Sequence, residues 1–139
     1  MALINWSTKL SVGVFQLDAD HVILIGLINQ LYDAMSEGHG QQLTKTILAT
    51  LKEYTVSHFS REEALMNEQK YPDYEAHKEY HKKLISQLNE FMARHAAVNT
   101  SVTPPEMAQF LQGWLINHIQ KADFAYKPFM PVEAGFTDC

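Results

Sequence analysis

The sequence predicts an all-α protein, an up-down-up-down four-helix bundle with an extended N-terminal arm. Four segments carry apolar residues at three- and four-residue spacing, which is the pattern of a helix with one face in a core. The connections between these segments are short, so consecutive helices are expected to run antiparallel. The chain has 139 residues, a length that fits a single core, and we expect one domain over residues 1–139.

Capping residues mark where the first helix begins. The arm is expected over residues 1–17, where apolar residues surround Gly13 without forming a helical stripe. Asp18 or Asp20 can then act as the N-cap, because a carboxylate accepts hydrogen bonds from the free amides of a first turn. The first helix is therefore predicted over about residues 18–37.

Turn residues delimit the other three helices. The glycines of residues 38–40 end the first helix, because glycine tolerates a left-handed conformation there. Pro72 disfavours helix at the residue before it, and Asp73 can cap the third helix. Thr103 with Pro104 is a helix start, since proline is tolerated at the first helical position. The second, third and fourth helices and a loosely held tail are predicted over about residues 41–67, 73–97, 104–126 and 127–139.

Composition excludes several classes of function. The chain has 11 Lys and Arg against 16 Asp and Glu, and this acidic balance argues against nucleic acid or an anionic membrane as partner. No apolar run reaches the ~18 residues of a membrane span, and residues 10–17 are too short and polar for a signal-peptide core. We therefore expect a cytoplasmic protein. Cys139 is the one cysteine, so no disulfide can form within the chain.

Histidines and carboxylates fall on the apolar faces of all four predicted helices. They comprise two pairs at i,i+4, one pair at i,i+5 and one single histidine: His58/Glu62, His77/His81, His118/Asp123 and His21. A carboxylate buried without a partner is costly or loses its charge, whereas a metal ion compensates the burial. Nitrogen and oxygen donors suit iron, manganese or zinc. The set could supply ligands for two metal ions inside the bundle.

The spacing of His118 and Asp123 predicts a local irregularity. Residues five apart diverge by about 140° on a regular α-helix, so they do not share a face. Either Asp123 reaches around the helix, or the helix contains a one-residue π-bulge, a feature often found at functional sites. We expect irregular backbone between these two residues.

Each residue also has an ordinary structural interpretation. A lone His21 on an apolar face is more often a hydrogen-bonded core residue than a ligand, and His58 with Glu62 alone would most often be a surface pair. The coincidence of all of them on faces that must be buried favours the metal site. His39, in a loop, and His95, near the end of the third helix, are not expected to be ligands.

The same residues carry a resemblance to a known family. The pattern is Trp6…Ser11-Val12-Gly13-Val14…Asp18-x-Asp20-His21, then His58-Phe59-x-x-Glu62-Glu63-x-x-Met66, then His77-x-x-x-His81, then Trp114-Leu115-x-x-His118-Ile119-x-x-x-Asp123. Over about residues 6–126 it resembles the hemerythrins, in particular the single-domain bacteriohemerythrins.

The resemblance implies a non-haem di-iron centre that binds O2 reversibly. One iron, without an open position, would be held by His77, His81 and His118. The other, with a position for O2, would be held by His21 and His58. Both irons would be bridged by Glu62, Asp123 and an oxo or hydroxo group.

The resemblance also implies an apolar O2 pocket. Its expected walls are Leu24, Phe59, Met66, Trp114, Leu115 and Ile119. Such walls keep water from the bound dioxygen and slow autoxidation. The inward faces of the helices carry no further acid or base that we expect beside the ligands.

These inferences favour an O2-binding protein rather than an enzyme. It would act as oxygen carrier, store or local supplier, with O2 as its ligand and a separate protein as a conceivable acceptor. The alternatives are a di-iron redox enzyme acting on peroxide or nitric oxide, an O2 or redox sensor that works through a partner, and a zinc-stabilised bundle.

Overall fold

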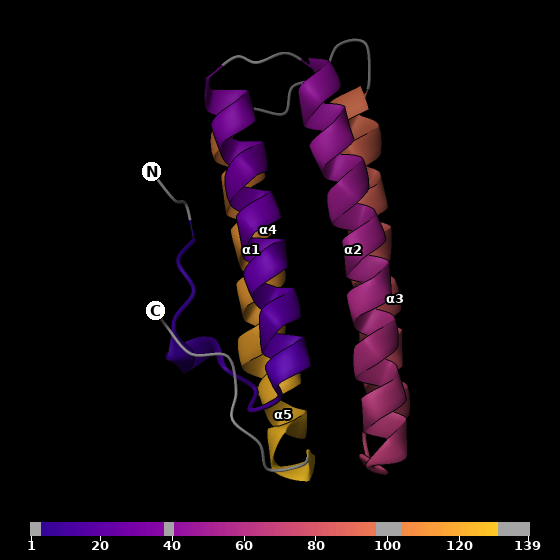
Figure 1. The fold of residues 1–139 in the computed structure, drawn as a ribbon. Helices are drawn as coiled ribbons and strands as arrows, with labels where there is room; N and C mark the ends of the chain where they lie inside the picture. The colour runs from indigo at the N-terminus through magenta and orange to yellow at the C-terminus, as the bar shows by residue number, and fades with distance from the viewer. Residues whose placement is uncertain (1–3, 38–40, 97–103, 131–139) are drawn as a thin grey trace.

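A computed structural model describes residues 4–37, 41–96 and 104–130, and they form the expected four-helix bundle. The long helices alternate in direction, so that α1 and α3 run one way while α2 and α4 run the other (Figure 1). Helix α1 packs against α2 and α4, and α2 packs against α3. The four helices are α1 (Phe15–Ser36), α2 (Gln41–Glu68), α3 (Tyr74–Ala96) and α4 (Pro104–Asn117).

Helix α1 begins earlier than the sequence indicated, at Phe15 rather than near residue 18. Neither aspartate is its N-cap, since Val14 occupies that position without a side-chain cap. Asp18 lies in the first turn and accepts hydrogen bonds from the Val12 amide at 2.8 Å and from the Ser11 hydroxyl at 2.6 Å. The expected cap is therefore corrected: Asp18 holds the N-terminal arm against the helix.

The arm crosses the outside of the bundle beside α1 and α4 (Figure 1). It contains one short turn, η1 (Thr8–Leu10). The backbone of Ile4 both donates to and accepts from the side-chain amide of Asn29 on α1, at 2.9 and 2.8 Å. Lys127, after the fourth helix, donates to the Ser11 carbonyl at 3.0 Å. The arm is thus held at two places, against the middle of α1 at Asn29 and against the end of the fourth helix at Lys127.

Helix α2 ends in a tight reversal that needs no glycine. Lys70 adopts a left-handed φ of 56°. The amide of Tyr71 donates to the Met66 carbonyl at 3.0 Å, and the amide of Lys70 donates to the Asn67 carbonyl at 3.2 Å. This is the Schellman arrangement, and its usual apolar contact is present because Tyr71 and Met66 lie in one buried cluster. Asp73 then stands in the cap position of α3, where its carbonyl accepts from the His77 amide.

The fourth helix changes its winding where the sequence predicted irregular backbone. A π-helical turn, η2 (His118–Asp123), follows α4 and is succeeded by α5 (Phe124–Tyr126) and η3 (Lys127–Phe129). A π-turn spreads its residues over a wider turn, so residues five apart come onto one face. The prediction of irregular backbone between His118 and Asp123 is confirmed, and of the two alternatives the structure has π-helical winding.

The buried core has two apolar clusters with a polar layer between them. Along α2, Phe59 belongs to the large cluster, Met66 belongs to the small cluster, and buried His58 and Glu62 lie between. The small cluster consists of Val12, Val14, Leu17, Met66, Tyr71, Tyr126 and Met130. The functional site occupies this polar layer.

Some expectations fall on residues outside the described ranges. They concern the helix end at 38–40 with His39, the cap at Thr103, the side chain of His95 and the tail after residue 130. Among the described helices, none combines the length and apolarity needed to cross a membrane.

Candidate metal centre

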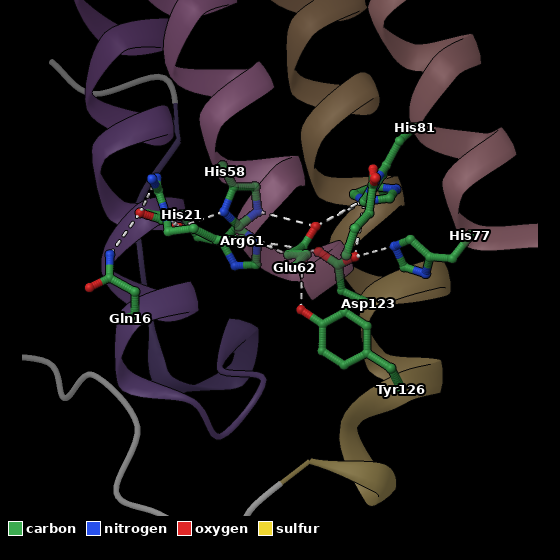
Figure 2. A network of polar contacts seen from close by, with 12 residues as sticks. Gln16, His21, His58, Arg61, Glu62, His77, His81, Asp123 and Tyr126 are labelled. Atoms are coloured by element: carbon green, nitrogen blue, oxygen red, sulfur yellow. Dashed lines mark hydrogen bonds and ion pairs between the residues drawn. The ribbon is translucent and has the colours of Figure 1, made fainter. Parts of the chain in front are cut away.

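The structure brings all seven predicted ligand residues into the polar layer. Every one of them is at least 95% buried, although histidine and carboxylate side chains are usually exposed. Helix α1 supplies His21, α2 supplies His58 and Glu62, α3 supplies His77 and His81, and the π-turn region supplies His118 and Asp123. Figure 2 shows the labelled histidines of α1, α2 and α3 converging on the carboxylates of Glu62 and Asp123.

The donor atoms form two groups that share both carboxylates. In each group, one donor atom per residue lies within 4.8 Å of all the others. The five-donor group contains Glu62, His77, His81, His118 and Asp123. The four-donor group contains His21, His58, Glu62 and Asp123. A pair of ions that shares two carboxylates matches this arrangement.

The histidines present their Nε2 atoms to the carboxylate oxygens. Glu62 Oε1 lies 3.2 Å from His81 Nε2 and 3.4 Å from His58 Nε2. Asp123 Oδ1 lies 2.9 Å from His118 Nε2 and 3.2 Å from His77 Nε2. The second oxygen of Asp123 lies 3.2 Å from His21 Nε2. Each carboxylate therefore faces histidines of both groups.

These facing atoms are left without a hydrogen bond among the described residues. They comprise Nε2 of all five histidines, Oε1 of Glu62 and both oxygens of Asp123. Buried polar atoms are normally satisfied, so such a concentration requires an explanation. Cations accept lone pairs from imidazole nitrogens and carboxylate oxygens together, and these donors suit iron, manganese or zinc. The residues present thus fit a pair of metal ions.

The outward nitrogens of two histidines are held by other carboxylates. His58 Nδ1 lies 2.8 Å from Asp20 Oδ2, and His81 Nδ1 lies 2.8 Å from Glu63 Oε2. A carboxylate can only accept, so each Nδ1 carries the proton and each Nε2 keeps its lone pair for the centre. Outer carboxylates of this kind fix the orientation of metal-binding histidines.

A buried phenol completes the surroundings of Glu62. Tyr126 donates to Glu62 Oε2 at 2.6 Å, while Oε1 of Glu62 faces the histidines. Burial raises the pKa of Tyr126 well above its ordinary value, and nearby Asp123 and Glu62 raise it further. The hydroxyl therefore keeps its proton and remains a donor.

The expectation that no further acid or base lies beside the ligands is wrong. Asp20, Glu63 and Tyr126 all make hydrogen bonds to the seven residues. The position of Tyr126 contained a signal, because it follows Asp123 by three residues and so lies near the same helix face. Asp20 gave no comparable signal, since its partners lie on another helix.

The histidines of the metal-free chain carry the charge that neutralises the carboxylates. Burial alone would lower the pKa of His58, but the charge of Glu62 and the hydrogen bond with Asp20 raise it to about 9. Burial likewise opposes ionisation of His118, yet the charge of Asp123 raises its pKa to about 10. Despite burial, the same pairings hold the pKa values of Glu62 and Asp123 below their ordinary range. Metal ions would replace these protons, so binding should release them.

An apolar cavity lies against the four-donor group. It has an empty volume of about 220 Å³. Its walls are Leu24, Phe59, Leu84, Trp114 and Leu115, together with His21, His58 and His118. Four of the expected pocket residues are among them, and Leu84 was not expected.

Two expected pocket residues lie elsewhere. Met66 packs in the small apolar cluster on the far side of Glu62, seven residues or about 10 Å along α2 from Phe59. Ile119 is fully buried in the large cluster but does not line the cavity. The sequence placed both residues near the ligands without specifying on which side they lie.

Comparisons with known proteins identify relatives over most of the chain. The family model described as Hemerythrin HHE cation binding domain matches residues 12–130. A bacteriohemerythrin of Methylococcus capsulatus (strain ATCC 33009 / NCIMB 11132 / Bath) is 33% identical over 133 residues, covering 92% of this chain and 97% of that protein. A bacteriohemerythrin of Pseudomonas aeruginosa (strain LESB58) is 32% identical over 126 residues, covering 91% of this chain and 80% of that protein.

Solved structures agree with these relatives. A crystal structure of a hemerythrin variant, in which a leucine is replaced by alanine, superposes with a TM-score of 0.84 at 30% identity. The match covers 94% of this chain and 98% of the other. A wild-type hemerythrin structure gives a TM-score of 0.82, also at 30% identity, with 91% and 97% of the two chains covered.

Proposed function

The chain belongs to the hemerythrin family, and on this basis we propose that it binds O2 reversibly at a non-haem di-iron centre. The observation that carries the proposal is the pairing of two donor groups with a dry apolar cavity on one of them. A metal pair without a cavity would favour a structural role, whereas a cavity without donors would leave nothing to bind dioxygen.

We assign the ligands by group. The five-donor group would hold an iron with no open position, because five protein donors and one bridging oxo or hydroxo group would complete six. The four-donor group would hold the second iron and, with one donor fewer, would leave a position for O2. Glu62 and Asp123, which belong to both groups, would be shared by the two ions. This assignment is supported by the two carboxylates that the groups share and by the cavity beside His21 and His58.

A ferrous pair bound here supplies the electrons that dioxygen accepts on binding and returns on release. The chain's own residues do the rest. Asp20 and Glu63 orient His58 and His81, and Tyr126 holds one oxygen of Glu62 through a proton that it keeps. All three hydrogen bonds are already formed in this structure, so these side chains need not move when metal binds.

The walls of the cavity exclude water from the open position. Leu24, Phe59, Leu84, Trp114 and Leu115 present aliphatic and aromatic surface to it. A dry site slows the loss of electrons to solvent-assisted autoxidation and so favours release of O2 unchanged. Trp114 is held in place because its indole nitrogen donates to the Leu84 carbonyl at 3.1 Å.

In this proposal the protein carries, stores or locally supplies O2 in the cytoplasm, with a separate protein as a conceivable acceptor. A di-iron oxidoreductase acting on peroxide or nitric oxide is the alternative, and it needs a proton donor at the open position. Tyr126 is the buried donor near the centre, but it lies against Glu62 and does not line the cavity. This position favours binding over turnover.

Metal analysis with optical spectroscopy tests the proposal. The protein should contain two irons per chain, and the anaerobically reduced form should develop a charge-transfer band on exposure to O2. The band should fade when O2 is removed and return on re-exposure. Irreversible oxidation would favour a redox enzyme or sensor, and zinc without iron would favour a structural centre.

A further inference from the structure

Asp20 is fully buried and charged, yet it belongs to neither donor group. Its Oδ2 lies 2.8 Å from His58 Nδ1 and accepts from Arg61 Nε at 2.9 Å. Its Oδ1 accepts from Arg61 Nη2 at 2.8 Å, from the Tyr54 hydroxyl at 2.9 Å and from the Gln16 amide at 3.1 Å. Every oxygen of this carboxylate is therefore occupied by a donor, and one of these donors is an expected metal ligand.

Arg61 donates two parallel hydrogen bonds to Asp20, one to each carboxylate oxygen. This bidentate arrangement gives a strong, directional ion pair. The guanidinium is itself steadied, since it donates to the Ser57 hydroxyl at 2.6 Å and lies 5.4 Å from the ring centre of Tyr54. Its side chain is 35% exposed, whereas Asp20 is completely buried. Arg61, whose side chain is labelled in Figure 2, is thus partly exposed to solvent and bonds through the Asp20 carboxylate to the outer nitrogen of His58.

The other oriented histidine lacks this arrangement. His81 Nδ1 contacts Glu63, whose side chain is 26% exposed and therefore screened by water. In the four-donor group, His21 Nδ1 has no hydrogen-bond partner among the described residues. His58 is therefore the histidine of that group whose orientation depends on a buried carboxylate.

We propose that Asp20 is the positioning residue for His58, and that Arg61 clamps Asp20 and moderates the negative charge it places on the metal of the four-donor group. The inference rests on the proposed function to the extent that His58 holds a metal. A carboxylate bonded to a ligand imidazole fixes its tautomer and raises its basicity. The guanidinium opposes the second effect, because it draws negative charge away from the imidazole.

Two substitutions separate positioning from charge. Asp20→Asn keeps the shape but removes the charge and weakens acceptance from His58, so affinity for Co²⁺ at one of the two sites should fall about 10–100-fold. Asp33→Asn is the matched control, because it removes the same charge from the same helix at a position remote from the donor groups. Titration of the metal-free protein with Co²⁺, followed by its optical absorption, measures both sites without requiring O2.

Arg61→Gln should act on the redox balance instead. With the guanidinium gone, Asp20 places more negative charge on the centre, which favours ferric over ferrous iron by about tenfold, or 59 mV for one electron. Arg61→Lys retains the charge with a single donor and should restore most of the potential. Arg94→Gln is the control, since Arg94 pairs with Glu106 at the surface and both side chains are at least half exposed. Spectroelectrochemistry of the iron-loaded variants measures this shift, which a purely structural role would not produce.

The outcomes distinguish the inference from the proposed function. Equal Co²⁺ affinities in Asp20→Asn and Asp33→Asn would overturn the positioning role. Equal potentials in Arg61→Gln and Arg94→Gln would overturn the clamp. If Asp20→Asn does not fold, the Arg61 series decides, because that side chain lies partly in solvent. A wild-type protein that binds two Co²⁺ but shows no reversible O2 band would contradict the proposed function, while the Co²⁺ comparison would still decide the role of Asp20.

Discussion

The five-donor group and the four-donor group share Glu62 and Asp123 but lie in different surroundings. On the five-donor side, aromatic rings cover the histidines: Tyr71 and Tyr126 contact the ring of His77, and Tyr80 stacks on His118 at 5.1 Å. On the four-donor side, a narrow apolar cavity with leucine, phenylalanine and tryptophan walls lies against His21 and His58 and also touches His118. The group with fewer donors is therefore the one beside the more enclosed apolar cavity, whereas the hollows at His77 and His81 are more open to the surface.

This difference indicates how a nearly symmetric pair acquires one reactive position. Both groups use the same carboxylates, so the asymmetry comes from one additional histidine and from the side chains packed outside the ligands. An open coordination position is useful to a ligand only where the ligand can reach it, and here the missing donor and the cavity coincide. Three experiments test this comparison, in order of decreasing effect.

Removal of a shared carboxylate should destroy both groups together. Glu62→Ala takes one donor from each group and leaves Tyr126 without its acceptor. Metal content should fall from two ions per chain to less than one. The metal-free fold should lose about 3–5 kcal/mol, since buried histidine charges lose their partner. Elemental analysis and thermal unfolding measure both effects.

The control for this variant is Glu53→Ala, an exposed glutamate on the same helix. It should bind metal and melt as the wild type does. Full metal loading and unchanged melting of Glu62→Ala would show that the groups do not share this carboxylate functionally.

Removal of one histidine should affect the two groups unequally. His21→Ala leaves three donors in the four-donor group, and the protein should retain about one ion per chain. His77→Ala leaves four donors in the five-donor group, which is the number that the intact four-donor group has. This variant should therefore still bind about two metal ions per chain, one of them with weaker affinity. Metal titration of the two variants side by side measures the difference. Identical losses would remove the distinction between the groups.

Enlargement of the cavity should have the smallest effect on metal content and a clear effect on oxidation. Leu115→Ala opens space beside the four-donor group, admits water and should speed autoxidation several-fold with both irons retained. Leu111→Ala on the same helix is the matched control, because Leu111 is equally buried in the large cluster but does not line the cavity. Each variant should lose about 2–5 kcal/mol of stability. Equal autoxidation rates would reduce Leu115 to an ordinary core residue.

The sequence predicted those features that depend on position along one helix. Apolar spacing located the four helices, and the five-residue interval between His118 and Asp123 predicted the irregular backbone that the structure shows as a π-turn. Reasoning from position along one helix failed for Asp20, because capping preferences indicated that it could begin the first helix. Its partners His58 and Arg61 lie on another helix, so only tertiary contacts define its role.

The sequence predicted which residues lie near the site better than it predicted on which side of the ligands each of them packs. Met66 and Phe59 are both apolar residues of α2 close to Glu62, and nothing in their spacing separates the cavity wall from the small cluster. Leu84 lies on an apolar stripe of α3 that resembles any other core stripe, and it becomes a cavity residue only when four helices are assembled. Tyr126, by contrast, could have been predicted from helical periodicity, because it follows Asp123 by three residues.

Both donor groups include Asp123, which lies in the π-turn after α4 and is the last of the seven residues to leave a ribosome. His21, at the other end of the set, is synthesised among the first. Proteins emerge from the amino terminus, so a nascent chain that has completed three helices still has neither group. Capture of both irons in the proposed manner must therefore wait until residue 123 has been synthesised, and a chain truncated before it should lose the four-donor site and bind less tightly at the other. Two bound irons would then mark molecules in which all four helices have been made and packed together.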